Sequence, residues 1–82
     1  MVTPEAIQAY IHEKLSCDHL AVEGDGAHFQ AVIVSAAFAG KSRVQRHQIV
    51  YTALGDRMRE EIHALSMQTL TPDEWSRHAV HP

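Results

Sequence analysis

The chain has 82 residues, of which 45% are hydrophobic and 21% charged, and its formal net charge is -3. This balance excludes a disordered chain, and a length this short leaves room for one core only. The negative charge also excludes a general attraction to phosphate, so nucleic-acid binding would need a local basic patch. We therefore expect one domain over residues 1–82, with residues 76–82 as a loose C-terminal tail.

The N-terminal half predicts a helix followed by a β-hairpin. A threonine and a proline precede an apolar stripe at helical spacing, which predicts a helix over residues 4–15. Residues 19–23 and 28–35 are extended segments, and the Gly-Asp-Gly sequence at residues 24–26 is a turn between them. Because the second segment is apolar on both faces, we expect it to be the central strand of the sheet.

The C-terminal half predicts a helix, a strand and a last helix. The first of these helices begins after a Ser42 cap and ends or kinks at Gly55. Residues 56–61 form a further helical turn, residues 62–70 a third strand, and a capped helix start follows with Trp75. The predicted buried stripe of the helix after Ser42 contains Val44, His47, Tyr51, Leu54 and Met58.

This order of elements predicts an α+β fold, α-β-β-α-(α)-β-α. The helices should pack on one face of a three-stranded sheet, because each apolar stripe needs a layer to cover it. The connection between the second and third strands is long enough to cross over to a parallel neighbour. The predicted sheet is therefore mixed.

Cysteine content and hydropathy predict the compartment. One cysteine, Cys17, cannot form an internal disulfide. No apolar run approaches the roughly 20 residues that cross a bilayer, and no signal-peptide pattern opens the chain. We expect a cytoplasmic protein without membrane contact.

Residues 28–75 carry several motifs whose order and spacing agree. They are His28-Phe29, Phe38-x-Gly40, Val44-x-x-His47-x-x-Val50-Tyr51, His63-Ala64-Leu65-Ser66 and Thr71-Pro72-x-x-Trp75. Together these motifs resemble the BolA family, and especially its IbaG (YrbA) branch. The resemblance implies a fold similar to the class II KH domain and a protein that is not an enzyme.

The resemblance also implies a partner. BolA proteins pair with monothiol glutaredoxins, and such pairs hold a bridging 2Fe–2S cluster to which the BolA member contributes an imidazole. The glutaredoxin would supply thiolate and glutathione, and no cofactor is expected to bind tightly to the isolated chain, which would be a monomer or weak homodimer. Some relatives are described as transcription regulators or acid-stress proteins, so the alternative is a nucleic-acid-binding regulator of the stress response.

The resemblance selects His63 as the first candidate ligand. Its position in His-Ala-Leu-Ser matches the cluster-ligating histidine of the family, although a strand histidine by itself is more often an ordinary surface residue. Relatives often place the second donor between the first two strands, where this chain has residues 24–27 without cysteine or histidine. The nearest imidazole is His28, which can instead cap the strand or stay solvated, and His19 is a weaker candidate.

The remaining polar residues favour structural roles. His47 lies within the predicted stripe and should be packed with a hydrogen bond, and the tail residues His78 and His81 should be solvated. A basic cluster of Lys41, Arg43 and Arg46 is the one candidate for nucleic-acid binding, although a solvated helix start explains it equally well. A KH domain clamps the nucleic-acid backbone with Gly-x-x-Gly, and Gly40 here has no second glycine three residues later. No nucleophile–base motif is present in the sequence.

Overall fold

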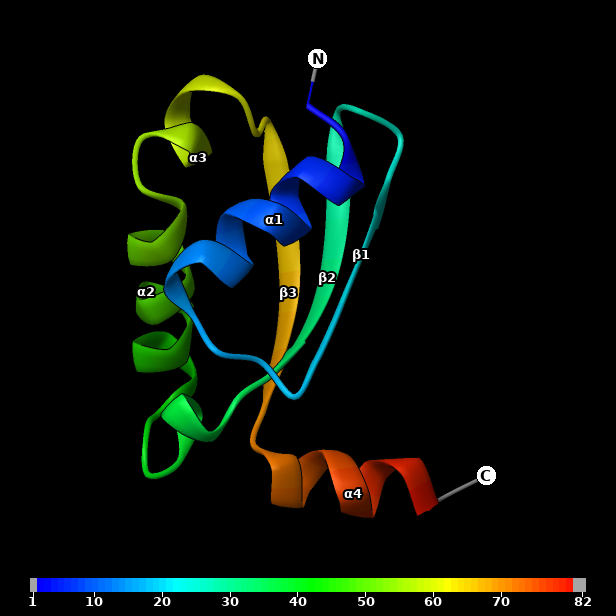
Figure 1. Cartoon of the computed structure of the whole chain (residues 1–82), viewed down its shortest axis with the longest axis vertical. Coiled ribbons are helices and arrows are strands. Elements are labelled where there is room, and N and C mark those ends of the chain that lie inside the picture. The colour runs from blue at the N-terminus through cyan, green and yellow to red at the C-terminus, as the bar shows by residue number, and fades with distance from the viewer. Residues whose placement is uncertain (1, 81–82) are drawn as a thin grey trace.

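The computed structural model describes the backbone of residues 2–80 and the side chains as far as residue 77. The predicted order of elements is confirmed (Figure 1). The elements are α1 (Pro4–Lys14), β1 (His19–Gly24), β2 (His28–Val34), the 3-10 helix η1 (Ala36–Phe38), α2 (Arg43–Leu54), α3 (Arg57–Glu60), β3 (Ala64–Leu70) and α4 (Pro72–Val80). No helix within residues 2–80 has the length and hydropathy needed to span a membrane.

The three strands form one mixed sheet in the order β1-β2-β3. β1 and β2 are antiparallel, whereas β2 and β3 are parallel because the chain between them passes through α2 and α3. α1 and α2 pack against each other and against the sheet, and Figure 1 shows α4 beyond the lower end of the strands. The predicted fold class is therefore confirmed, with α4 at the end of the sheet.

The core lies between the sheet and the two long helices. Alternate residues of β2 point into this core. The opposite face of β2 is polar and exposed where the strand begins and becomes buried at Val34, where the strand ends. This burial explains why β2 is apolar on both faces at one end. The fully buried large apolar side chains come from four segments and are Ile7, Ile11, Phe29, Ile33, Val34, Phe38, Val50 and Leu54.

The buried face of α2 differs from the predicted one. Val44 is 66% exposed and Tyr51 41% exposed, whereas Val50, Ala53 and Leu54 are buried. The sequence alone did not determine which side of α2 faces the core, because this helix has apolar residues on more than one side. Packing on α1 and β3 selected the face that contains Val50.

The last helix extends into the segment predicted as a tail. α4 continues to Val80, so the backbone of residues 76–80 is helical. At its start, the Thr71 hydroxyl accepts the Glu74 backbone N–H at 3.1 Å, and the Glu74 carboxylate accepts the Thr71 N–H at 2.8 Å. This reciprocal cap fixes the start of the helix. The prediction for the side chains of His78 and His81 lies outside the described residues.

Candidate functional site

Two exposed imidazoles meet where the parallel strands begin. His28 is the first residue of β2 and pairs in register with Ala64, the first residue of β3, so His63 lies one residue before that pair. The ring centroids of His28 and His63 are 6.4 Å apart, with the ring planes at 86°. The structure therefore brings together the two residues selected as metal ligands.

Buried neighbours hold the two histidines at this place. Phe29, directly after His28, is 1% exposed, and Ile62, directly before His63, is 3% exposed. Since successive side chains of a strand point to opposite sides, burying Phe29 turns His28 outward, and His63 is exposed in the bend between the buried Ile62 and the start of β3. Packing of these neighbours in the core thus fixes the backbone from which the two imidazoles project.

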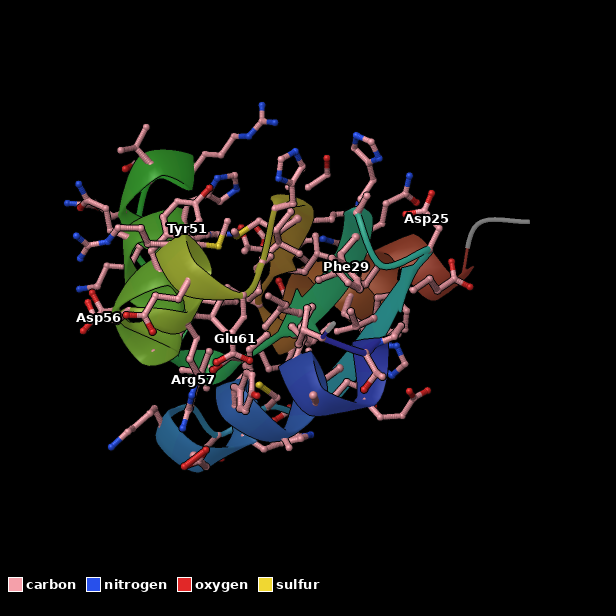
Figure 2. The ribbon with its side chains drawn as sticks, turned by 90° about the horizontal axis from the view of Figure 1, so that it is seen from above. Asp25, Phe29, Tyr51, Asp56, Arg57 and Glu61 are labelled. Carbon is pink, nitrogen blue, oxygen red and sulfur yellow. The ribbon has the colours of Figure 1, made fainter. Side chains whose placement is uncertain are left out.

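The turn before His28 is fixed by Gly24 and Asp25. A Cβ atom at Gly24 would lie 2.5 Å from the His28 carbonyl oxygen, so no larger residue fits there without moving the strand. Asp25 Oδ1 accepts the backbone N–H groups of His28 at 2.8 Å and Ala27 at 3.0 Å. These hydrogen bonds hold the pKa of Asp25 below its usual value. Figure 2 shows Asp25 on the turn and Phe29 directed into the molecule.

The sequence pattern predicts only a turn at Asp25. Its role in holding the His28 backbone was missed, although an aspartate two to three residues before free backbone N–H groups is the usual signal for such a side-chain turn. The carboxylate therefore fixes the position from which His28 extends.

The histidine pair is an incomplete metal site in this chain. Within the part of the chain whose side chains are described, no three His, Cys, Asp or Glu residues are grouped so that they could hold a metal ion. A 2Fe–2S cluster needs two ligands on each iron from outside the cluster. The pair therefore supplies two of the four outside ligands that a 2Fe–2S cluster needs, with no third donor beside it among the described residues.

His19 lies far from the pair. It begins β1, is paired with Val34 at the end of β2, and is therefore six residues, or about 20 Å, from His28 along the sheet. Its ring is stacked on Trp75 of α4, with centroids 4.6 Å apart and planes at 14°. The candidate role of His19 as a second donor beside His63 is thus corrected to packing between β1 and α4.

The basic cluster is smaller than the sequence suggests. Arg46 has a side chain only 14% exposed and forms two hydrogen bonds with the Glu74 carboxylate, at 2.7 and 3.3 Å. It also donates to the backbone carbonyls of Thr69 at 3.1 Å and Lys41 at 3.0 Å. A guanidinium with all of these acceptors has little capacity left for phosphate, so we remove Arg46 from the candidate nucleic-acid surface.

The other polar candidates have ordinary environments. Lys41 and Arg43 are exposed at the start of α2, and His47 is half-buried rather than packed in the core. Burial raises the pKa of the Cys17 thiol, and Asp18 adds to the shift. A raised pKa lowers the thiolate fraction, so Cys17 has no sign of an activated nucleophile.

A protein-family model described as BolA-like protein matches residues 3–74, which is nearly the whole chain. The chain belongs to the BolA-like protein family. The resemblance found in the sequence is thereby confirmed. The site described above is therefore a feature of a BolA-like chain.

Individual BolA-like relatives agree with this assignment. Acid stress protein IbaG of Escherichia coli strain K12 is 42% identical over 72 residues, which cover 87% of this chain and 86% of that protein. The solved structure of a bolA protein homologue from Coxiella burnetii has a TM-score of 0.86 at 46% identity, covering 94% of this chain and 100% of that one. The DNA-binding transcriptional regulator BolA of Haemophilus influenzae is 44% identical over 57 residues, or 70% of this chain and 55% of that protein. These relatives are named as a stress protein and a regulator, not as enzymes.

Proposed function

We propose that this BolA-like chain is a non-enzymatic cytoplasmic adaptor that pairs with a monothiol glutaredoxin to bind a bridging 2Fe–2S cluster. It would serve iron–sulfur trafficking or the sensing of iron and stress. The observation that carries the proposal is the exposed pair of His63 and His28, 6.4 Å apart between ring centroids. In this assignment His63 is one ligand and His28 the second donor of this chain.

The pair has the chemistry that a shared site requires. Imidazole nitrogen binds iron well, and both rings lie on the surface where a partner can approach. With only two donors grouped among the described residues, the remaining ligands are those that a glutaredoxin thiolate and glutathione would supply.

Anaerobic reconstitution tests the proposal. The full chain, a monothiol glutaredoxin, glutathione, ferrous iron and sulfide are combined, and visible absorption and circular dichroism are compared with those of glutaredoxin treated alone. We expect a changed spectrum, and a higher reduction potential because imidazole replaces thiolate at one iron. A spectrum equal to that of glutaredoxin alone would refute the pairing.

DNA binding is the second candidate function. It is favoured by the name of the Haemophilus influenzae relative and by two exposed cations, Lys41 and Arg43, at the start of α2. The net charge of -3 and the ion pair of Arg46 with Glu74 leave few positive charges for phosphate. Any binding through this surface should therefore be weak and strongly dependent on salt.

Salt titrations measure the contribution of this surface. If Lys41 and Arg43 contact phosphate, replacing both by glutamine should lower the slope of log affinity against log salt by about 0.9 per lost contact. Arg59→Gln is the matched control, because Arg59 is 83% exposed and lies on α3. Equal slopes for the double variant, the control and the wild type would exclude a DNA surface at this helix start.

A further inference from the structure

The unpaired positive charge of this chain is gathered in one region. Four of its seven lysine and arginine residues form ion pairs, namely Arg46–Glu74, Arg57–Glu13, Arg59–Asp56 and Arg77–Asp73. Figure 2 shows one of them, Arg57, directed toward α1. The other three cations, Lys14, Lys41 and Arg43, have no carboxylate partner within the described residues. They lie at the end of α1 and around the start of α2.

Lys14 and Lys41 line the same groove between α1 and α2. This groove has a volume of about 480 Å³, and its apolar wall is made by Leu15, Ile49 and Ala53. Its polar residues are the two lysines, two glutamines and a threonine, with no carboxylate among them. A negatively charged ligand would therefore meet cations and hydrogen-bond donors, and its apolar part would meet aliphatic side chains.

The glutamine nearest the start of α2 strengthens this donor character. The Gln45 side-chain oxygen accepts the Ser42 backbone N–H at 2.8 Å as part of the helix cap. This oxygen already accepts one hydrogen bond, so the N–H₂ donor is the group more available to a ligand. The polar side of the groove thus selects acceptors, and in particular anions.

We propose that this groove binds a small amphipathic anion, namely a carboxylate with an aliphatic chain. The volume lies within the usual range of about 300–1,000 Å³ for small-molecule sites. A nucleic-acid backbone would neutralise the lysines but leave the apolar wall uncovered, and a neutral hydrocarbon would leave the lysines without a partner. An alkyl carboxylate satisfies both parts of the groove.

The groove is separate from the histidine pair. It lies at the C-terminal end of α1 and along α2, whereas His28 and His63 lie where β2 and β3 begin, at the opposite end of the sheet from η1 (Figure 1). The proposal therefore does not depend on cluster binding, and each can fail without the other.

Decanoate, below the concentration at which it forms micelles, is the probe for this site. We expect saturable shifts of backbone amide signals in nuclear magnetic resonance spectra of the full chain, centred on Leu15, Ile49 and Ala53. The signals of His28 and His63 should stay unchanged. Shortening the chain to octanoate should weaken binding by about fourfold for each methylene that the groove buries. Decyltrimethylammonium, which has the same chain and the opposite charge, should bind at least tenfold more weakly.

Charge variants complete the test. Lys14→Gln and Lys41→Gln should each weaken decanoate binding by about threefold, as expected for exposed ion pairs, and Arg59→Gln should have no effect. The proposal is overturned if decanoate gives no saturable shifts, if the cationic detergent binds as well as decanoate, or if the lysine variants bind like the wild type. It is also overturned if hexaglutamate, which has no aliphatic chain, shifts the same signals with equal affinity, since the groove would then be a surface for acidic proteins.

Discussion

Replacement of His63 by alanine should reduce the cluster signal of the complex with a monothiol glutaredoxin by at least tenfold while the domain stays folded. The imidazole is exposed and its ring centroid lies 6.4 Å from that of His28, so its removal leaves no cavity in the core. Removing a group that only orients a metal ligand typically lowers metal affinity 10- to 100-fold. Removing a ligand itself should lower the affinity further. Visible circular dichroism of the reconstituted complex measures the loss of the cluster signal. Far-ultraviolet dichroism shows whether the domain stays folded.

Two further histidine variants separate ligation from surface charge. His28→Ala should also weaken the cluster signal, because His28 is the imidazole that the parallel pairing places beside His63. His19→Ala is the matched control, since it removes an exposed imidazole at the far end of the sheet. A folded His63→Ala variant with the spectrum of the wild type would remove the histidine pair from the proposed function, and an equal loss in all three variants would argue for a nonspecific effect.

Arg46→Ala should lower the free energy of unfolding by about 2–3 kcal/mol, the largest effect that we expect from any charged residue of the chain. The substitution leaves the Glu74 carboxylate without its guanidinium and the Thr69 carbonyl, in a residue only 9% exposed, without its donor. Thermal unfolding should show a midpoint lowered by roughly 10–20 °C for a domain of this size. Arg59→Ala, which breaks an exposed pair on α3, should change the stability by less than about 0.5 kcal/mol.

The same ion pair predicts how stability depends on pH. Hydrogen bonds from Arg46 first, and then from the Thr71 backbone N–H, lower the pKa of Glu74 to about 2. Because the folded pKa lies below the unfolded one, this contribution is present above about pH 5 and is lost as the pH falls toward 2. The acid loss of stability should be smaller in Arg46→Ala than in the wild type. Equal stability of Arg46→Ala and the wild type at pH 7, or equal acid dependence, would contradict the assigned role of this ion pair.

Much of the fold could be predicted because it depends on local pattern. The two glycines around Asp25 indicated the turn, and the apolar run after His28 indicated a central strand. Caps at Ser42 and Thr71 marked helix starts that the structure confirms. In each case the residues that form the feature are neighbours in the chain, so their spacing contains the information.

The candidate site could be predicted only in part. Family motifs selected His63, but two candidates remained for the second imidazole, because His19 and His28 both stand at the start of a predicted strand. The parallel register of β2 with β3 places His28 beside His63, and the antiparallel register of β1 with β2 sends His19 to the other end. Register between strands is a property of the sheet and not of either strand alone.

The sequence by itself therefore determined the order of elements, the hairpin turn, the central strand and the first candidate ligand. The tertiary structure alone decided which imidazole accompanies His63, which face of α2 is buried and which cations are free. The reason is the same in all three cases. Arg46 and Glu74 are 28 residues apart and His28 and His63 are 35 apart, so their contacts exist only once the core has brought these segments together. The packing of that core follows from all of its buried residues at once, and no local spacing encodes it.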